Sequence, residues 1–342
     1  MVIARFMKKI RRKLMAHSNS SLNCFANCMA KYEHNYILHT PPCKPTSPHL
    51  IFGTMAHEVL YNAGTLRDTV ADGLVPDYST IIPSELVYTD LKQFFKIKSW
   101  YSYFYPIIKR CADYEAQLCT EFTDNYTIQR EVKLQLTVDQ LREFGWNVDN
   151  ALVGIVDLLI MSKTKAVIVD YKFSTKVKGQ DDFDMNSQLQ LYAFLVHTLY
   201  DIPLHNITIA YMDIPKTEFA FPEVLSNGKL SRAKSQNVSQ ENYLQAVQDL
   251  HGSDPVYNCD KGGYYYETFM SLANNKPVYL NKRYVDFEAY AGIMKDLQNA
   301  AEMIDKMKRD NMPFLKKYDS YSCGSCEYLN ACKPWVTVEG GM

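Results

Sequence analysis

Two carboxylates and a lysine lie in two neighbouring apolar segments of the chain. Asp157 is in LVGIVDLLI, and Asp170 and Lys172 are in AVIVDYKFS. Both segments are rich in β-branched residues, which predicts two buried strands. The short polar linker MSKTK between them is typical of a hairpin turn, so we expect both carboxylates at one end of a sheet.

This arrangement favours metal-dependent phosphodiester hydrolysis. A buried carboxylate is costly unless a cation or a hydrogen-bond donor compensates it. Mg²⁺ takes oxygen ligands and is typically held by one or two carboxylates together with substrate phosphates. Lys172 follows Asp170 by two residues on the same strand face, where its charge would stabilise a developing negative charge.

Four short segments of the chain occur in an order that is typical of one protein family. They are residues 53–58 (GTMAHE), 154–157 (GIVD), 170–172 (DYK) and 188–192 (QLQLY). In these motifs the chain resembles the PD-(D/E)xK nuclease superfamily, specifically its RecB-like branch, over about residues 50 to 200. The resemblance implies an α/β fold with a restriction-endonuclease-like core, which is a mixed central sheet flanked by helices.

The resemblance also implies roles for single residues. Mg²⁺ or Mn²⁺ would be held by His57, Asp157, Asp170 and the carbonyl of Tyr171. Lys172 would orient the attacking water or stabilise the charged transition state. Gln188 and Tyr192, one helical turn apart, would position the substrate strand. Whether Glu58 or Glu131 joins the metal site stays open.

The nine cysteines provide a second line of inference. Cys323, Cys326 and Cys332 have the spacing of metal ligands and leave one ligand to be found. The segment around Cys28 resembles the N-terminal segment of the iron–sulfur nucleases, including AddB and the CRISPR-adaptation exonucleases, in which Cys24 falls at a non-ligand position. The resemblance implies a [4Fe-4S] cluster on these four cysteines, and a structural Zn²⁺ is the alternative. Either centre would tie distant parts of the chain together as a staple.

Composition limits how the protein can contact nucleic acid. The formal net charge of the 342-residue chain is −1, and 13% of its residues are aromatic. This charge disfavours a broad basic face for duplex DNA and favours a local groove in which bases stack on aromatic rings. Residues 2–15 form a basic amphipathic pattern that fits a DNA-contacting arm, a membrane-surface helix, a poorly ordered extension or a short presequence. We expect a cytoplasmic protein of a bacterium or of a phage-infected host, with reduced thiols and no membrane span.

Periodicity predicts the elements that must hold these residues. We expect helices at residues 22–37, 50–62, 94–122, 183–200 and 284–307, with the third broken or kinked at Pro106. We expect strands at 126–138, 152–160, 166–173 and 206–213. Residues 225–238 are polar and rich in turn formers, which predicts a loop.

These elements suggest four regions. They are a basic extension (1–17), a helical region with the first cluster cysteine and the first motif (18–125), the nuclease core (126–222), and a C-terminal region with a loop insertion, a long helix and the cysteine triplet (223–342).

The function predicted from the sequence is a metal-dependent DNA exonuclease. It would act on single-stranded DNA or free ends in phage or bacterial recombination, repair or replication. One alternative is a nuclease subunit of a CRISPR-adaptation or recombination complex with protein partners. Another is an inactive nucleic-acid-binding scaffold, which the intact Asp157, Asp170 and Lys172 disfavour. No G-x-x-x-x-G-K-[ST] loop is present in the sequence, which excludes a helicase–nuclease fusion of the RecB type.

Overall fold

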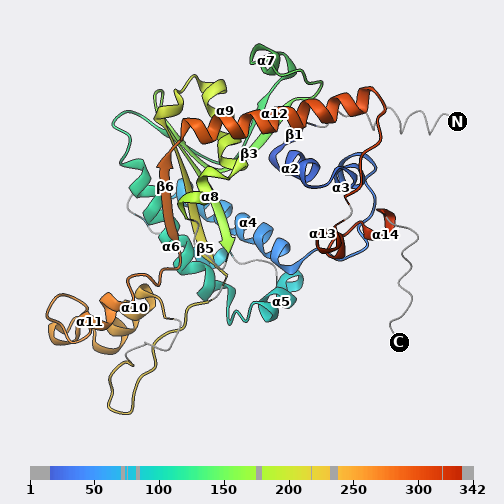
Figure 1. The fold of residues 1–342 in the computed structure, drawn as a ribbon. Helices are drawn as coiled ribbons and strands as arrows, with labels where there is room; N and C mark the ends of the chain where they lie inside the picture. The colour runs from blue at the N-terminus through green and yellow to red at the C-terminus, as the bar shows by residue number, and fades with distance from the viewer. Residues whose placement is uncertain are drawn as a thin grey trace, which may run out of the picture.

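The fold is built on one mixed β-sheet. The computed structural model describes residues 16–70, 74, 76–81, 85–174, 179–216, 218–231, 238–317 and 319–332. Its strands are β1 (His17–Ser18), β2 (Thr127–Leu136), β3 (Leu152–Met161), β4 (Ala166–Ser174), β5 (Ile207–Pro215) and β6 (Tyr279–Tyr284). The order is β1-β3-β4-β5-β6, and β2 also pairs with β3. The predicted α/β core with a mixed central sheet is therefore confirmed (Figure 1).

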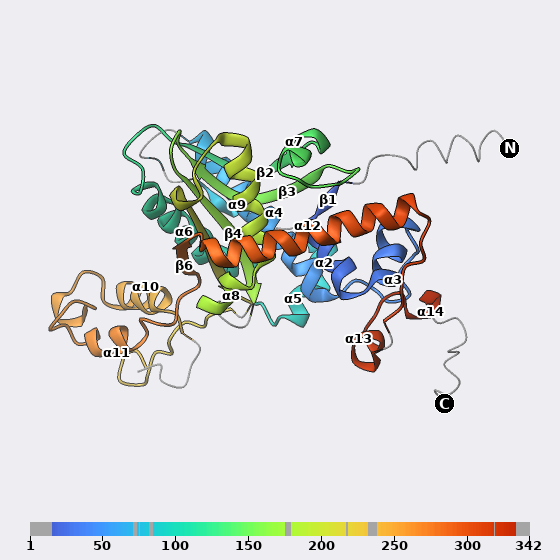
Figure 2. The same ribbon diagram turned by 45° about the horizontal axis from the view of Figure 1, so that its top comes forward.

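Helices cover both faces of this sheet. The first cluster of buried apolar residues joins one face to α2 (Asn19–Asn27), α9 (Ser187–Tyr200) and α12 (Phe287–Arg309). The second joins the other face to α4 (Pro48–Thr69), α5 (Glu85–Phe94) and α6 (Trp100–Cys119). Figure 2 shows α12 running across the molecule along α9 and α2. The sheet is thus buried on both sides, which explains the nearly continuous apolar runs of β3 and β4.

Several helix boundaries differ from the predictions. The helix expected at residues 22–37 is interrupted at Cys28, whose backbone is extended (φ −162°, ψ 110°). The chain continues as α3 (Met29–Tyr32) and a π-helix (Glu33–Ile37). The helix expected at 94–122 is α6, which contains Pro106 and begins only at Trp100. Lys96 has φ 56°, which a right-handed helix cannot accommodate, so the break precedes α6 rather than falling at Pro106.

The remaining predicted elements are present with shifted ends. The helix expected at 50–62 is the longer α4, and the one expected at 183–200 is divided into α8 (Gln180–Asp184) and α9. Asn186 accounts for this division, because its side chain accepts from the Leu189 N–H and caps the start of α9. The short strands β1 and β6 lie at the ends of the strand order and were not predicted.

A separate lobe lies between β5 and β6. It contains α10 (Gln240–His251), α11 (Tyr266–Ser271) and its own cluster of buried apolar residues around Tyr243 and Tyr265. The loop expected at 225–238 belongs to this lobe where it is described. Figures 1 and 2 show that the lobe projects from the sheet, whereas α12 packs back on the core.

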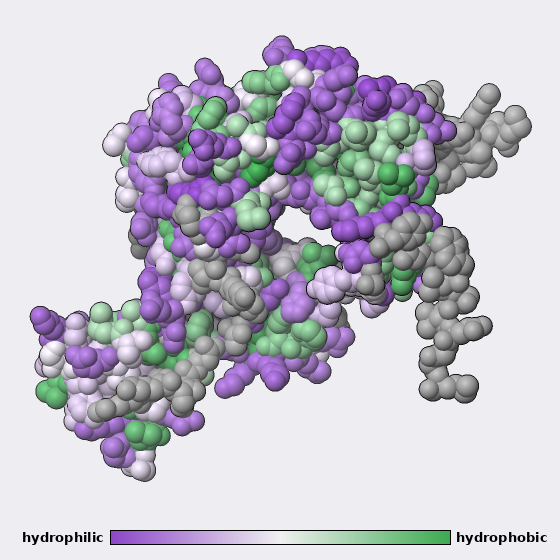
Figure 3. Space-filling view, in the orientation of Figure 1, coloured by the Kyte–Doolittle hydropathy of each residue, from purple (hydrophilic) through white to green (hydrophobic). Residues whose placement is uncertain are grey.

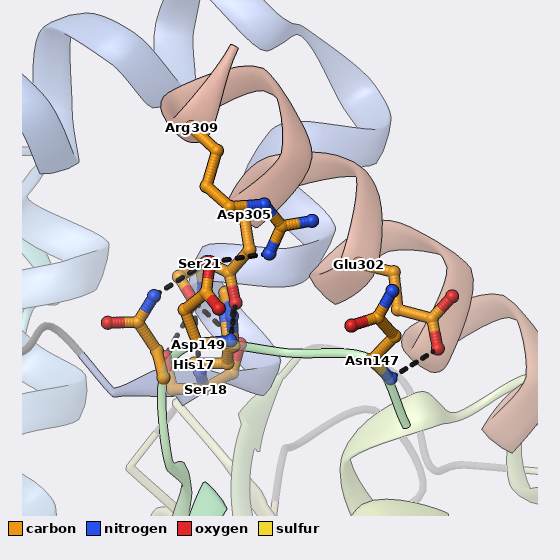
Figure 4. Close-up of polar contacts among 9 residues, drawn as sticks. His17, Ser18, Ser21, Asn147, Asp149, Glu302, Asp305 and Arg309 are labelled. Atoms are coloured by element: carbon orange, nitrogen blue, oxygen red, sulfur yellow. Dashed lines mark hydrogen bonds and ion pairs between the residues drawn. The ribbon is translucent and has the colours of Figure 1, made fainter. Parts of the chain in front are cut away.

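A buried carboxylate fixes α12 to the start of the described chain. Asp305 accepts from His17 Nε2 at 3.0 Å, from the Asp149 N–H at 2.7 Å and from Asn150 Nδ2 at 2.6 Å. Figure 4 shows this cluster, together with Arg309, which pairs with Asp149. We call the contacts of Asp305 with these three partners the Asp305 clasp; it joins β1, the segment before β3, and α12.

The C-terminal segment returns to the N-terminal helices. The Ala30 N–H donates to the Leu315 carbonyl at 3.1 Å, and the Cys43 N–H donates to the Glu327 carbonyl at 2.7 Å. The short helices α13 (Ser320–Gly324) and α14 (Leu329–Cys332) lie on either side of Glu327. Elsewhere, α7 (Val138–Glu143) lies between β2 and β3. Of the expected extension 1–17, residues 1–15 lie outside the described part. No helix in the described part is both long and apolar enough to cross a membrane.

Candidate active site

The two predicted aspartates meet where β3 and β4 separate. The strands form the expected antiparallel hairpin, and their pairing runs from Met161 with Ala166 to Leu158 with Val169. Asp157 and Asp170 are the next residues on the two strands. Beyond them, Asp157 Oδ2 accepts from the Tyr171 N–H at 2.7 Å in place of a strand-to-strand bond. Near its start, β3 pairs instead with β1, so the edge of β3 facing β4 is open at Asp157.

A matched kink aims Asp157 and Glu131 at this opening. On β3, Val156 packs in the first apolar cluster and Leu158 in the second, although residues two apart on a regular strand share a face. On β2, Glu131 has φ 48°, a left-handed conformation that is strained for a residue with a side chain. The two strands stay in register, with Arg130 opposite Leu158 and Val132 opposite Val156. Both strands therefore reverse their faces at the same level.

Helix α4 brings a histidine to the kink from one face of the sheet. His57 Nδ1 lies 3.3 Å from Asp157 Oδ1 and 3.7 Å from Glu131 Oε1. One ligand atom from each of these three residues fits within 4.8 Å of the others, and in the part of the chain that the structure describes no other such group is found. Burial opposes a charge on His57, but the carboxylates of Asp157 and Glu131 outweigh it and raise its pKa to about 10. The three side chains thus favour a positive charge between them, which fits a divalent cation.

Helix α9 reaches the same point from the opposite face. Lys172 Nζ lies 2.7 Å from Asp170 Oδ2 and donates to Gln188 Oε1 at 3.0 Å. Gln188 Nε2 lies 2.8 Å from the Tyr192 hydroxyl and donates to it. Burial and the charge of Asp157 raise the pKa of Asp170 to about 7, against the effect of Lys172. The four residues form one chain of contacts from β4 to α9.

Close packing explains why a glycine precedes Asp157 on β3. A Cβ at Gly154 would lie 2.8 Å from both Leu195 Cδ1 and Tyr192 Cε1. The glycine therefore lets α9 approach β3 closely, which brings Tyr192 and Gln188 to the open edge. The sequence motif contains this glycine, but only the packing of α9 against β3 explains why a glycine is needed there.

An ion-pair network behind the site holds β2 against α4 and α6. Arg130, the neighbour of Glu131, pairs with Asp68 on α4 and with Glu115 on α6. Arg67 pairs with the other oxygen of Glu115. The Arg130 side chain is only 6% exposed, so the network anchors β2 next to its strained residue. Sequence analysis did not identify Arg130 or Glu115, because neither lies in a motif.

The structure thus collects most of the predicted site residues. One opening in the sheet is lined by His57, Asp157, Asp170, Lys172, Gln188 and Tyr192. Glu131 lies in the same group as His57 and Asp157. Glu58 is exposed and is not part of that group. Tyr171 contributes its N–H to Asp157 and packs its ring in the second apolar cluster. The role of its carbonyl stays a prediction.

The four predicted cluster cysteines line one pocket. Cys28, Cys323, Cys326 and Cys332 border it together with Lys31, His34 and Tyr328. The Tyr328 N–H donates to Cys326 Sγ at 3.4 Å, and Lys31 pairs with Glu327 at 3.1 Å. The break in the helix at Cys28 occurs at a pocket-lining residue. Cys24 instead packs against the first apolar cluster, and burial raises the pKa of its thiol to about 11.

Four thiols around one pocket fit either a [4Fe-4S] cluster or a structural Zn²⁺, since thiolates bind both.

A gap runs through the molecule between α2 and α4. Figure 3 shows it in the space-filling view, and Figure 1, in the same orientation, shows α2 above it and α4 below it.

The fold and the site agree with a nuclease of the hydrolase class, and the sequence comparison shows this class. The sequence matches the PD-(D/E)XK nuclease superfamily over residues 16–333, and the chain belongs to this superfamily. Its members act on nucleic acid and typically use divalent metal ions. No curated protein matches the sequence.

Two solved structures are similar to the chain. A protein from Eubacterium rectale, described as a candidate exonuclease, is 8% identical with a TM-score of 0.45; the match covers 96% of this chain and 90% of that one. The protein SSO0001 is 13% identical with a TM-score of 0.28; the match covers 84% of this chain and 98% of that one.

Proposed function

We propose that this protein is a metal-dependent deoxyribonuclease that degrades DNA from free ends, with a preference for single strands. The observation that carries the proposal is the meeting of two groups at one opening in the sheet. His57, Glu131 and Asp157 form an oxygen- and nitrogen-rich group on one side, and Asp170 and Lys172 lie across from it. We propose recombination, repair or replication of phage or bacterial DNA as its setting.

Different residues of the site would bind the metal and stabilise the transition state of hydrolysis. His57, Glu131, Asp157 and Asp170 would hold Mg²⁺ or Mn²⁺, with the Tyr171 carbonyl as a further ligand. The bound metal would supply a hydroxide near neutral pH and polarise the scissile phosphate. Lys172 places its ammonium where negative charge develops on the phosphate oxygens. Gln188 holds that ammonium through its side-chain oxygen, and Tyr192 in turn holds Gln188.

The preference for single strands rests on shape and charge. A formal net charge of −1 gives little general attraction to duplex DNA. The gap between α2 and α4 in Figure 3 would suit a single strand that enters by its end. A threaded strand requires a free end, so covalently closed circles should resist cleavage.

We further propose a [4Fe-4S] cluster on Cys28, Cys323, Cys326 and Cys332. Its support is the common pocket and the N–H donated to Cys326 Sγ. Structural zinc is the alternative. In either case the centre would join α2 and α3 to the last described residues.

The test is degradation of DNA labelled at the 5′ or the 3′ end, single- and double-stranded, with Mg²⁺ or Mn²⁺. We expect short products from linear single strands and little cutting of closed duplex circles. Asp157→Ala, Asp170→Ala and Lys172→Ala should each abolish cleavage while the circular dichroism spectrum stays native. Wild-type rates for Asp170→Ala at saturating Mg²⁺ would exclude this site, and rapid linearisation of circles would exclude the dependence on ends.

A further inference from the structure

One stripe of α4 leads from the helix start to the active site. His49, Gly53 and His57 follow one another at intervals of four residues, so they lie along the same side of the helix. Eight residues of α-helix span about 12 Å. His57 belongs to the group with Glu131 and Asp157, whereas His49 is exposed at the other end of the stripe.

Among the residues that the structure describes, none explains Gly53 in the middle of this stripe by packing. A Cβ at this position would meet none of their atoms within 4 Å. Gly64 on the same helix is different, because a Cβ there would lie 2.1 Å from Arg130 Nε. Glycine inside a helix is less stable than alanine, so Gly53 lowers helix stability without serving a neighbour within the described chain. Open space beside it leaves the helix backbone accessible to a ligand.

An aromatic and basic group lies at the start of the stripe. The His49 ring meets Phe94 edge-on at 5.5 Å and Phe95 at 5.3 Å. Phe94 is 55% exposed, although it is a large apolar residue. Lys216 Nζ lies 3.4 Å from His49 Nδ1 and, being an ammonium, donates to it.

The strand order connects this group to the catalytic strand. Lys216 follows Pro215, the last residue of β5, and Pro215 pairs with Ser174 at the end of β4. Asp170 and Lys172 lie earlier on β4. His57 and Phe52 of α4 both contact Phe173 of that strand, at ring distances of 5.6 and 6.0 Å. The stripe and the end of β4 therefore run side by side toward the site.

We propose that His49, Phe94 and Lys216 form a nucleotide-binding subsite for one nucleic-acid strand, which passes over Gly53 to reach His57. Phe94 and His49 offer ring surfaces for a base, and Lys216 offers a cation for a phosphate. The glycine lets the strand lie close to the helix. This inference rests on the proposed function, since it supplies a path for the substrate of that site.

Binding without cleavage tests the subsite directly. The probe is a fluorescein-labelled oligothymidylate, measured by anisotropy with the Asp170→Ala protein as background. Phe94→Ala should weaken binding roughly 5- to 150-fold, the range for loss of one stacked base. Lys216→Met should reduce the slope of log K against log salt by roughly 0.7, the value for one phosphate of a single strand. The control is Phe144→Ala, another exposed aromatic residue (48%), which should leave binding unchanged.

A glycine pair tests the path over α4. Gly292 in α12 also lies inside a helix, and a Cβ there would likewise meet nothing within 4 Å. Gly53→Met and Gly292→Met should both raise the melting temperature, because methionine is a better helix former. Only Gly53→Met should weaken oligothymidylate binding. Equal binding by both variants would overturn the proposed path.

The outcomes separate this inference from the proposed function. If the wild-type protein degrades DNA but Phe94→Ala and Lys216→Met keep wild-type binding and KM, the subsite is wrong and the nuclease assignment stands. If no nucleic acid is cleaved with any divalent metal but binding still depends on Phe94 and Lys216, the nuclease assignment is wrong and the subsite stands.

Discussion

Glu131 combines a strained backbone with a position beside His57 and Asp157. A left-handed conformation costs a residue with a side chain about 1–3 kcal/mol, and such strain is often found at functional sites. The neighbouring Arg130 is held by two carboxylates, which secures β2 where the strain occurs. We infer that the fold tolerates the strain because it directs the Glu131 carboxylate toward His57 and Asp157, where the proposed metal would bind.

The first prediction concerns this carboxylate. Glu131→Gln keeps the shape of the side chain but removes its charge, so Mn²⁺ affinity measured by calorimetry should fall roughly 10- to 100-fold. Glu58→Gln is the matched control, since Glu58 neighbours His57 in sequence but is exposed. Glu131→Gly should lose metal affinity and yet unfold at a higher denaturant concentration, because glycine relieves the strain. Unchanged Mn²⁺ affinity in Glu131→Gln would remove this residue from the metal site.

The second prediction concerns how Lys172 is held. Gln188→Leu removes the oxygen that accepts from Lys172, so kcat should fall by up to about 100-fold through misplacement of the ammonium. KM should change little if Gln188 acts through Lys172. Tyr192→Phe removes only the bond to Gln188 and should have a smaller effect in the same direction. A rise in KM with unchanged kcat would instead indicate that Gln188 and Tyr192 bind the substrate strand.

At the scale of single elements, the Asp305 clasp secures the layer that contains α9 and α12. Burial opposes the charge of Asp305, but the donors His17, Asp149 N–H and Asn150 outweigh it and hold the pKa of this carboxyl below its ordinary value. Such a carboxylate stabilises the fold above its unfolded pKa of about 3.9, and this contribution is lost as the pH falls through the lower folded pKa.

The third prediction follows from this sign. Asp305→Asn should lower the free energy of unfolding at pH 7 by about 1–3 kcal/mol, because one of the two acceptor oxygens becomes an amide group that faces buried donors. The difference from wild type should shrink as the pH falls below about 4, where the unfolded chain binds a proton that the folded carboxylate does not, and it should be smallest once the pH is below the folded pKa. Urea titrations at several pH values measure it. Glu302→Gln is the control. Glu302 also lies on α12 and accepts from the Asn147 N–H, but it is only half-buried (Figure 4). A difference that is constant down to pH 2 would contradict the role of the charge.

The sequence predicts those parts of the site that lie on regular elements. The β3–β4 hairpin brings Asp157 and Asp170 together as expected, because strand pairing fixes which residues are adjacent. Glu131 could not be assigned, since its left-handed φ has no signature in the sequence. The contact of Gln188 with Lys172 depends on how closely α9 approaches β3 at Gly154, which only packing determines. The break between α2 and α3 at Cys28 could not be predicted, because the helical periodicity of the sequence continues through this residue.

At the scale of the whole molecule, the cysteine pocket joins segments nearly three hundred residues apart. A centre bound only by the folded protein contributes its binding free energy to folding. Loss of the proposed centre should therefore release the segments around Cys28 and Cys323 before it disturbs the opening between β3 and β4.

The fourth prediction is that protein purified without oxygen is brown and contains iron and acid-labile sulfide. Cys28→Ala should bleach it and make both segments sensitive to protease, because one of four ligands is lost. Cys24→Ala should keep the colour, since Cys24 packs against the apolar core rather than lining the pocket. A colourless preparation with one equivalent of zinc would replace the cluster by zinc and leave the staple intact.

The pocket that Cys28 shares with the last described cysteines also has a consequence for the order of events during translation. The ribosome makes 304 residues after Cys28 before it completes Cys332. At roughly 5–20 residues per second, this interval is about 15 to 60 s. During it, β1 and α2 can dock only on partners that already exist, first β3 and then Asp305 on α12. The Asp305 clasp therefore forms late, and a nascent chain halted before Asp305 would lack it although the β3–β4 hairpin is already synthesised.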